Sequence, residues 1–488
     1  MVKKRIMIVS IMFLFVIAII TVRLAYLLLS NTEGNEYTVN DQVTSKSVLF
    51  YPRGKIYDRN LIALSGKIED DTLPIEEYTA TIAKDIIGEL SYDENNTTIE
   101  GIKGISGLQE IFDSELNGGL PLKIAMYKDA LGTTINNGNI LVYGDHPNTG
   151  ISLQTTLDYH IQKLIEEEIE IELNNNNYKG IGVVVTDVTT GEILGMDSVG
   201  DHTNKTVLCY QPGSIFKILV AAKALELGVV NLDTIFECQG TIEIDGNIKH
   251  CYKDEGHGEI TLLNAFAQSC NVAFYQIAML LNDYDENGNI VYNKVLDLAK
   301  EFGFQVDNEE KSEEFLLSYN YSFPIIPSRL YNKMDVFNVA LGEGLIMASP
   351  LTLTKIVATI ANDGVLMEPS IISKQLDANG NILEESITTT KRIFNSEVND
   401  KLKLLLEEVC KTGTGKDNSI EQYGGMAGKS GTAQHVSDKE NHAWFAGYFP
   451  ADDPKYAMTV FVEEGGTSTE VALPLYDSLA QKILNLYP

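Results

Sequence analysis

The stretch QPGSIFKILVAAKALELG, residues 211–228, decides the fold because it predicts a helix that is apolar on nearly every side. Pro212 and Gly213 interrupt whatever precedes them, and Gly228 closes the helix after Leu227. A helix without a polar face is stable only when other elements surround it. We therefore expect this segment inside a large core and not on a surface.

Ser214 and Lys217 are the only polar residues in the first two turns of this helix, and residues three apart share a helix face. Ser214 has an ordinary interpretation as an N-cap, but a capping box would carry Glu or Gln where Lys217 stands. A buried cation in the first turn opposes the helix dipole and costs free energy. Burial and the positive helix end favour the neutral amine, which can accept the Ser214 hydroxyl proton. The pair therefore predicts a nucleophile with its general base.

The N-terminal sequence predicts a membrane anchor. Basic residues at 2–5 precede an apolar run at 6–29 that only Arg23 interrupts, and no small-residue cleavage site follows it. By the positive-inside rule, residues 1–5 form a cytoplasmic stub, and residues 6–29 form a single uncleaved transmembrane helix in the cell membrane. Residues 31–488, with any catalytic domain, are then extracytoplasmic. The formal charge of −31 argues against nucleic acid as a partner.

The remainder is long enough for two domains. Residues 30–150 mix short apolar runs with acidic and Asn-rich turns, which indicates a small α+β domain without a catalytic constellation. Residues 151–488 open with a strand and a helix that Asp158 caps, and a hairpin at 182–196 precedes the apolar helix. Strands next to a buried helix indicate a layered α/β domain.

Two further polar segments are candidates for the same site. Ser269 and Asn271 lie on a turn between helical segments and can face the Ser214 helix. Residues 429–432, Lys-Ser-Gly-Thr, precede two strong strands. On an edge strand, their ammonium and hydroxyl groups would attract a carboxylate, and Gly431 would let a peptide approach the backbone. The similar stretch at 411–415 is interpreted as a flexible loop that ends a helix.

The five cysteines do not form a disulfide scaffold. Cys238 and Cys251 flank a short hairpin that can bring them together. The neighbouring His250 and His257 raise the alternative of a metal site, but adjacent His250 and Cys251 point apart, and the spacing matches no common zinc pattern. We therefore expect a disulfide or free thiols here, and no metal.

The order Ser214-x-x-Lys217, Ser269-x-Asn271 and Lys429-Ser430-Gly431 resembles the three motifs of penicillin-binding proteins and serine β-lactamases. Residues 52–60, PRGKIYDRN, resemble the pedestal signature of class B, monofunctional penicillin-binding proteins. The resemblance covers nearly everything after residue 50 and is weakest in 61–150. Two positions depart from the family pattern: Cys270 lies inside the second motif, and Glu343 stands where Gln is familiar.

The resemblance implies a mixed α/β (α+β) fold, with a sheet flanked by helices in a transpeptidase domain at 151–488 and a small α+β pedestal at 30–150. It also implies acyl transfer without metal or cofactor. Ser214 would attack a D-Ala–D-Ala carbonyl with Lys217 as general base, Ser269 would relay the proton, and Asn271 would orient Lys217 and the substrate amide.

The same resemblance assigns the binding groups. The backbone N–H groups of Ser214 and Thr432 would form the oxyanion hole. The terminal carboxylate of the substrate would be held by Lys429, Ser430 and Thr432, with Gly431 between them.

The implied partners are peptidoglycan stem peptides, β-lactams that acylate Ser214, the membrane, and a glycosyltransferase of the shape, elongation, division and sporulation (SEDS) family. Three alternatives stay open. A serine β-lactamase would need a Glu to activate the deacylating water, and none can be placed. A β-lactam sensor would need a larger cytoplasmic portion than residues 1–5. A scaffold that activates the glycosyltransferase would not need Ser214.

Overall fold

The computed structural model describes residues 2–29, 44–50, 53–65, 80–91, 103–118, 122–127, 141–143, 150–176, 178–200, 203–307, 322–433 and 440–487. Contacts group the chain into two units. The first comprises Met1–Pro52, Asp93–Gly101 and Gly119–Asn148, and the second comprises Arg53–Tyr92, Ile102–Gly118 and Thr149–Pro488. The domain boundaries expected from the sequence stay a prediction.

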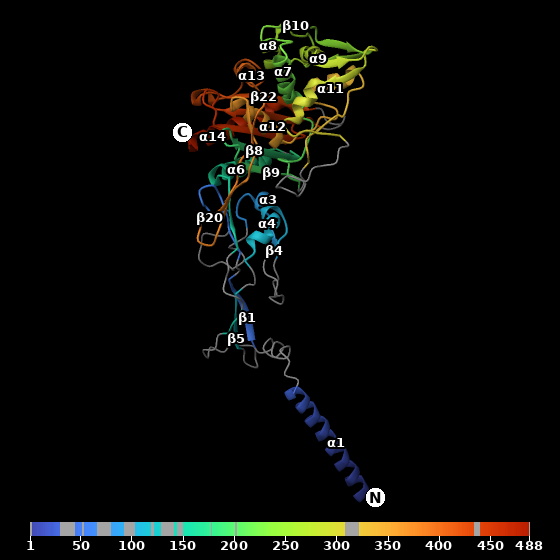
Figure 1. The fold of residues 1–488 in the computed structure, drawn as a ribbon, viewed down its shortest axis with the longest axis vertical. Helices are drawn as coiled ribbons and strands as arrows, with labels where there is room; N and C mark the ends of the chain where they lie inside the picture. The colour runs from blue at the N-terminus through green and yellow to red at the C-terminus, as the bar shows by residue number, and fades with distance from the viewer. Residues whose placement is uncertain are drawn as a thin grey trace. The chain divides into compact units, whose positions relative to one another are not determined.

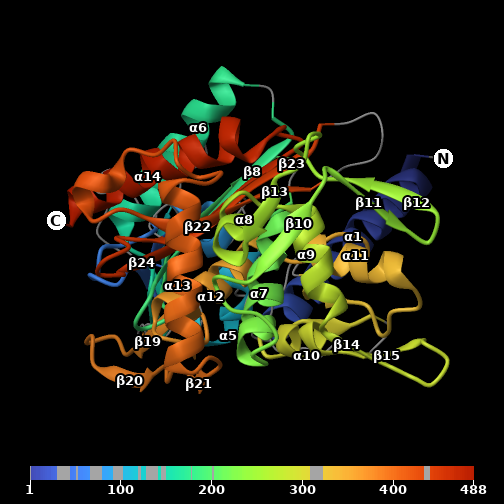
Figure 2. The ribbon, with the colours of Figure 1, turned by 90° about the horizontal axis from the view of Figure 1, so that it is seen from above.

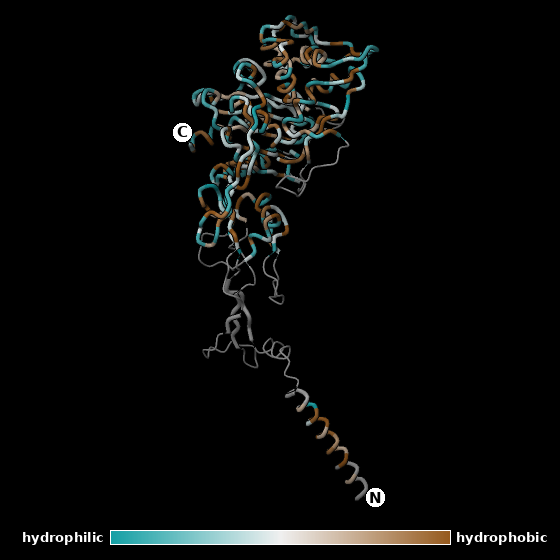
Figure 3. Tube along the Cα trace, in the orientation of Figure 1, coloured by the Kyte–Doolittle hydropathy of each residue, from teal (hydrophilic) through white to brown (hydrophobic). Residues whose placement is uncertain are grey.

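The first unit contains a helix and a small sheet. Helix α1 (Val2–Leu29) covers the apolar run at 6–29, and Figure 3 shows hydrophobic residues along it. The sheet is antiparallel, in the order β1 (Thr44–Phe50), β5 (Leu122–Tyr127) and β6 (Leu141–Tyr143). Within the described ranges, no helix combines the length and the hydropathy that a bilayer crossing requires.

A five-stranded antiparallel sheet forms the centre of the second unit, in the order β22–β23–β24–β8–β9 (Figure 1). Its strands are β8 (Gly180–Asp187), β9 (Ile193–Val199), β22 (Ala427–Ala433), β23 (His442–Phe449) and β24 (Tyr456–Glu463). The expected hairpin at 182–196 is thus β8–β9. The segment Lys429–Thr432 lies on β22, at one end of the strand order.

Helices cover both faces of this sheet. Helices α6 (Tyr159–Asn175) and α14 (Leu473–Leu486) pack on one face, and α12 (Pro350–Ala361) packs on the other, as Figure 2 shows from above. Alternate residues of β23 point to opposite faces of the sheet and pack in two different hydrophobic clusters. Phe445 packs in the cluster with α6 and α14, while its neighbour Trp444 packs in the cluster that contains the apolar helix. This layering confirms the predicted α/β class.

The apolar segment at 211–228 forms two elements and not one helix. A 3₁₀ turn, η2 (Gly213–Phe216), leads into α7 (Lys217–Glu226), and Leu227 caps its C-terminus. Gly213 has a positive φ of 57°, and its N–H donates to Gly342 O at 3.1 Å, so the chain turns sharply before α7 begins. The burial prediction is confirmed, because Ile218, Leu219 and Val220 of α7 are fully buried.

Further elements pack around α7 and complete the hydrophobic core that contains it. They are α8 (Leu262–Ala267), α9 (Asn271–Met279), α10 (Lys294–Lys300), α11 (Lys333–Leu341) and α13 (Ser396–Lys411). The hairpins and short strands are β10 (Ile235–Cys238) with β13 (Gly258–Thr261), β11 (Thr241–Ile244) with β12 (Asn247–His250), β14 (Asn282–Tyr284) with β15 (Ile290–Asn293), β16 (Gln305–Val306) with β17 (Ile325–Ile326), and β18 (Val365–Met367) with β21 (Thr390–Arg392).

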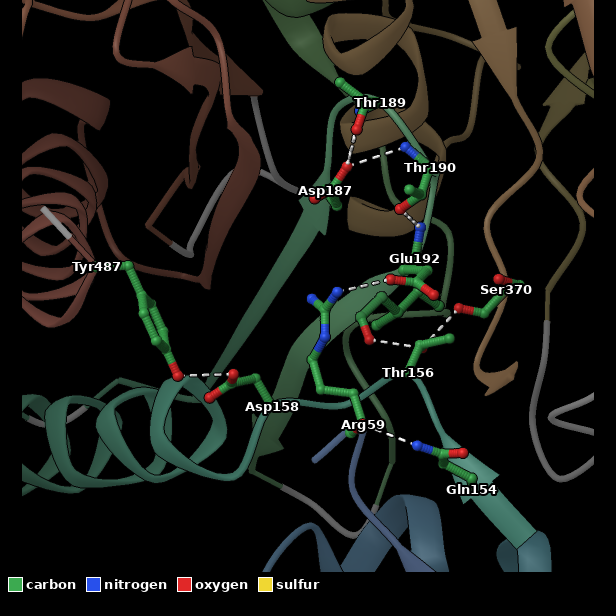
Figure 4. Close-up of polar contacts among 11 residues, drawn as sticks. Arg59, Gln154, Thr156, Asp158, Asp187, Thr189, Thr190, Glu192, Ser370 and Tyr487 are labelled. Carbon is green, nitrogen blue, oxygen red and sulfur yellow. Dashed lines mark hydrogen bonds and ion pairs between the residues drawn. The ribbon is translucent and has the colours of Figure 1, made fainter. Parts of the chain in front are cut away.

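The 53–65 segment belongs to the second unit and contributes a strand to a second sheet there. The order of this sheet is β2 (Ile56–Tyr57), β7 (Ser152–Thr155), β19 (Ile372–Leu376) and β20 (Ile382–Glu385). Figure 4 shows the polar contacts at this junction. Arg59 pairs with Glu192 at 3.0 Å, and Gln154 donates to Arg59 O at 2.8 Å. Asp158 caps α6, as predicted, and also accepts from the Tyr487 hydroxyl at 2.8 Å.

The described part of the signature at 52–60 also contacts α4 (Gly107–Ile111) and α5 (Asp113–Leu116). The other short elements of this region are α3 (Lys84–Ile87), β3 (Leu90–Ser91) and β4 (Lys103–Gly104). The buried Arg53 guanidinium donates to the Gln109 side chain and to Asp113 at 2.8 Å. The fully buried Asp58 carboxylate accepts from the backbone N–H groups of Asn60 and Ile62 at 2.7 Å. Charged residues of the signature therefore fasten this part of the chain.

Candidate active site

Ser214 occupies the 3₁₀ turn that precedes α7. Pro212 and Gly213 come before it, and Ile215 and Phe216 after it are buried, whereas Ser214 itself is partly exposed. Lys217 begins α7, so its amine projects from the first turn of a helix whose residues are buried except Lys223 and Glu226 near its C-terminal end. The turn therefore places a hydroxyl at the edge of the core, one turn away from an interior amine.

Lys217 is completely buried and hydrogen-bonded. Its Nζ donates to Ser269 O at 2.8 Å, to Ser269 Oγ at 3.1 Å and to Asn271 Oδ1 at 2.8 Å. Burial lowers the pKa of Lys217 from 10.5 to about 8, and the nearby Cys270, Cys251 and Glu343 act in the opposite direction. Near neutral pH, a part of the population therefore carries a neutral amine that can accept a proton. The structure brings Lys217, Ser269 and Asn271 together, as the motif order predicted.

The turn between α8 and α9 holds Ser269 in an uncommon conformation. Ser269 has a φ of 52°, in the left-handed region, which costs about 1–2 kcal/mol for a residue with a Cβ. Neighbouring backbone bonds retain the turn: Ser269 N donates to Phe266 O at 3.0 Å, and Cys270 N donates to Ala265 O at 2.8 Å. Cys270 then caps α9 by accepting from Ala273 N. The strained turn is what directs both Ser269 acceptor atoms at Lys217.

Strand β22 passes directly over the Ser214 turn. A Cβ added at Gly431 would lie 2.8 Å from Pro212 O, and one added at Gly213 would lie 2.8 Å from Thr432 O. Only glycine permits this approach of two backbones. The two segments that carry the expected oxyanion donors, the N–H groups of Ser214 and Thr432, therefore face one another.

The side chains of β22 divide between its two faces. Lys429 is completely buried. Its Nζ donates to Ser430 O at 3.1 Å and lies 5.8 Å from the centroid of the Phe266 ring. Burial, followed by the charge of Lys217, holds the pKa of Lys429 well below its ordinary value. Ser430 and Thr432 share the other strand face, where Ser430 is buried and Thr432 is partly exposed.

Thr414 is a site residue that sequence reasoning missed. Its Oγ1 lies 2.5 Å from Ser430 Oγ, and its N–H donates to Ala267 O at 3.1 Å. The loop at 411–415 ends α13, as predicted, but it also lines the site next to β22. The signal in the sequence was the likeness of Lys411-Thr412-Gly413-Thr414 to Lys429-Ser430-Gly431-Thr432, two segments that we treated as alternatives.

Four side chains of the types that can bind metals lie close together next to the Ser269 turn. The ligand atoms of Cys238, Cys251, His257 and Cys270 all lie within 4.8 Å of one another, and the three thiols are free and buried. Of the alternatives considered for Cys238 and Cys251, the structure thus has thiols and no disulfide. His250, the other candidate, is exposed on β12.

Comparison with known proteins assigns the family. A family model described as the penicillin-binding protein transpeptidase domain matches residues 181–484, which is more than half of the chain. The chain belongs to the penicillin-binding protein transpeptidase family. Its relatives are class B penicillin-binding proteins, so the resemblance noted in the sequence is confirmed.

Two curated relatives illustrate the match. Stage V sporulation protein D of Bacillus subtilis is 28% identical over 419 residues, which cover 78% of this chain and 60% of the relative. Peptidoglycan D,D-transpeptidase MrdA of Acinetobacter baumannii is 23% identical over 490 residues, which cover 89% of this chain and 66% of the relative. The chain thus spans less than two thirds of the length of these curated relatives.

Solved structures share the fold. Penicillin-binding protein 3 of Mycobacterium tuberculosis in complex with ampicillin has a TM-score of 0.71 and 22% identity, and the match covers 91% of this chain and 96% of that one. A structure described as "Structural coordination of polymerization and crosslinking by a peptidoglycan synthase complex" has a TM-score of 0.69 and 20% identity, covering 99% of both chains. The penicillin-binding protein fold is therefore confirmed.

Proposed function

We propose that this chain is a peptidoglycan D,D-transpeptidase that cross-links stem peptides through an acyl-enzyme on Ser214. One observation carries the proposal. The turn that holds the partly exposed Ser214 lies against strand β22, and the buried, hydrogen-bonded Lys217 follows that turn directly. The name of the Acinetobacter baumannii relative states the same activity for that protein.

In the acylation step, Ser214 Oγ attacks the carbonyl carbon between the last two D-Ala residues of a stem peptide, and Lys217 Nζ takes the hydroxyl proton. The bond to the terminal D-Ala then breaks, and Ser269 relays a proton to the departing amine. In the second step, the amine of another stem peptide attacks the ester. Ser214 regains its proton as the new amide forms, so the enzyme returns to its starting state.

Binding groups on β22 would orient the substrate. We assign the terminal carboxylate to Ser430 and Thr432, with Lys429 supplying charge from beneath the strand because it is fully buried. A bound carboxylate would raise the pKa of Lys429 by favouring its charged form. The N–H groups of Ser214 and Thr432 would stabilise the oxyanion, and each such donor contributes about 3 kcal/mol in other enzymes.

We further propose that β-lactams acylate the same serine and leave slowly. The name of the Acinetobacter baumannii relative favours the transpeptidase over the β-lactamase alternative. Helix α1 is our candidate for the single anchor in the cell membrane, with the N-terminus cytoplasmic and the second unit outside. In support, its large apolar side chains between Ile11 and Val22 are exposed. A SEDS-family glycosyltransferase is the proposed partner of the anchored protein.

A cross-linking assay tests the function. The full chain in detergent is incubated with a stem-peptide mimic that ends in D-Ala–D-Ala and with an acceptor amine, and the products are read by mass spectrometry. We expect the cross-linked product and released D-Ala from the wild type and from Ser396→Ala, an exposed serine on α13. Ser214→Ala should form neither. Product formation by Ser214→Ala, or hydrolysis alone by the wild type, would contradict the proposal.

A further inference from the structure

The loop that follows α11 is fastened to the turn η2, which carries the candidate nucleophile. Gly213 N donates to Gly342 O at 3.1 Å. Gln211 Nε2 donates to Gly344 O at 2.9 Å. A Cβ added at Gly342 would lie only 2.2 Å from Gly213 O, so the two backbones are in direct contact. Glu343 is the middle residue of this loop and is therefore held beside the candidate active site.

No described residue pairs with the Glu343 carboxylate. The side chain is half-buried, and within the described ranges it accepts no hydrogen bond and forms no ion pair. It lies close enough to Lys217 of α7 and Lys249 of β12 for both charges to lower its pKa, but burial has the larger effect and raises the pKa. The carboxylate is therefore available to a ligand that brings its own positive charge.

The position of this charge is unfavourable for stability. Helix α11 ends at Leu341, and Gly342 caps it in the left-handed conformation. A carboxylate just beyond a helix C-terminus faces the negative end of the helix dipole, and partial burial adds a desolvation cost. The familiar residue of the family at this position is Gln, which has the same length and no charge. A charge that the fold does not stabilise, next to a candidate active site, indicates a role in the chemistry.

The second step of the proposed reaction requires a base besides Lys217. A primary alkyl amine has a pKa of about 10.4, so near pH 7 fewer than roughly one molecule in a thousand is neutral. The attacking amine must therefore lose one proton before it attacks the ester and a second proton as the amide forms. Lys217 can pass the second proton to Ser214 Oγ. The first proton needs another acceptor near the ester.

We propose that Glu343 is the general base that takes this first proton from the ammonium group of the acceptor stem peptide. The role rests on the proposed function. The carboxylate removes one N–H proton, and the nitrogen lone pair that is freed attacks the ester carbonyl carbon. The bond from that carbon to Ser214 Oγ then breaks, and the second amine proton passes through Lys217 to Ser214 Oγ. Glu343, now protonated, returns its proton to solvent, to which its side chain is partly open.

The fate of the acyl-enzyme tests the proposal. The full chain in detergent receives a stem-peptide mimic that ends in D-Ala–D-Ala and, as acceptor, the side-chain amine of an acetylated lysine amide. Mass spectrometry then gives the ratio of amide product to hydrolysed donor, which depends only on the steps after acylation. Glu343→Gln should lower this ratio at least tenfold without abolishing the product, because the family pattern has Gln here. Glu286→Gln, at an exposed position between β14 and β15, should leave the ratio unchanged.

A second acceptor separates base catalysis from a structural role. Hydroxylamine is already neutral at pH 7 and needs no base before it attacks, so the wild type and Glu343→Gln should give equal product ratios with it. Glu343→Gln should also melt at or above the wild-type temperature, since the substitution removes a charge that the fold does not stabilise. A folding defect would then not account for the loss with the lysine amine.

Four results would overturn the role of Glu343 as base. The first is an unchanged ratio in Glu343→Gln with the lysine amine, and the second is an equal loss with both amines. A ratio that rises in Glu343→Gln would show that the carboxylate activates water and not the amine. A loss that saturating amine restores would show that Glu343 only binds the ammonium group. If the wild type is never acylated, the proposed function itself fails, whereas acylation with an unchanged ratio refutes the role of Glu343 alone.

Discussion

At the scale of single residues, we propose that Lys217 controls the reactivity of Ser214. A lysine amine accepts a proton only in its neutral form, and complete burial lowers the pKa of Lys217 to about 8. The hydrogen bonds to Ser269 and Asn271 fix where the amine lies. The turn before α9 thus fixes the position of the amine, whereas burial is the main influence on its protonation, with Cys270, Cys251 and Glu343 acting in the opposite direction.

The pH dependence of acylation follows from this pKa. The neutral fraction of Lys217 rises as pH increases, from about one tenth at pH 7 to a plateau above pH 9. The second-order rate of acylation by a fluorescent penicillin should therefore rise with pH and level off, with its midpoint near 8. Glu343→Gln should move the midpoint to lower pH, because the Glu343 charge raises the pKa of Lys217.

Glu255→Gln, at an exposed position, is the matched control and should leave the midpoint unchanged. A rate that is independent of pH between 6 and 9 would refute the role of Lys217 as base. An equal shift of the midpoint in Glu343→Gln and Glu255→Gln would show that the net charge of the protein, and not the position of Glu343, determines the pKa of Lys217.

At the scale of elements, the site depends on how closely β22 approaches η2. Gly431 and Gly213 remove the side chains that would separate the two backbones. The close approach sets the position of Thr432 relative to Ser214, which an oxyanion hole requires.

Gly431→Ala tests this contact. The new Cβ would lie 2.8 Å from Pro212 O and 2.9 Å from Ile215 Cγ1, so strand and turn must separate. Loss of one oxyanion donor lowers turnover by about 100-fold or more in other enzymes, and we expect acylation to slow at least tenfold. Gly380→Ala, where a Cβ meets nothing within 4 Å, should cost some stability and leave acylation unchanged. Equal acylation by Gly431→Ala and wild type would show that the approach is not required.

The sequence predicted these elements unevenly, and the reasons are physical. Local patterns were sufficient for the α6 cap at Asp158, the β8–β9 hairpin and the burial of α7, because each depends on residues close in the chain. The 3₁₀ turn before α7 was not predicted, since it depends on the bond from Gly213 to Gly342, over a hundred residues away. The Thr414–Ser430 contact was missed for the same reason, as was the position of Cys270 beside Cys238, Cys251 and His257, three residues that we considered together from the sequence alone.

At the scale of the whole molecule, the second unit includes more than the matched family domain. The 53–65 segment contributes β2 to a sheet with β7 and β19, and the buried ion pair of Arg53 with Asp113 fastens the neighbouring helices. Ile56 and Leu108 pack in one hydrophobic cluster with Val184 of β8, so described residues within 53–118 also contact the sheet that carries β22. The sequence assigned the signature at 52–60 to the pedestal domain, and its composition did not show which residues it would contact.

The account as a whole depends on Ser214 being the nucleophile, and peptide mapping tests this most directly. The full chain is incubated with a penicillin, digested with trypsin and analysed by mass spectrometry. We predict one penicilloyl adduct on the peptide Thr206–Lys217, at Ser214, in the wild type and in Ser396→Ala, and none in Ser214→Ala. An adduct on any other residue, or one that persists in Ser214→Ala, would contradict the account.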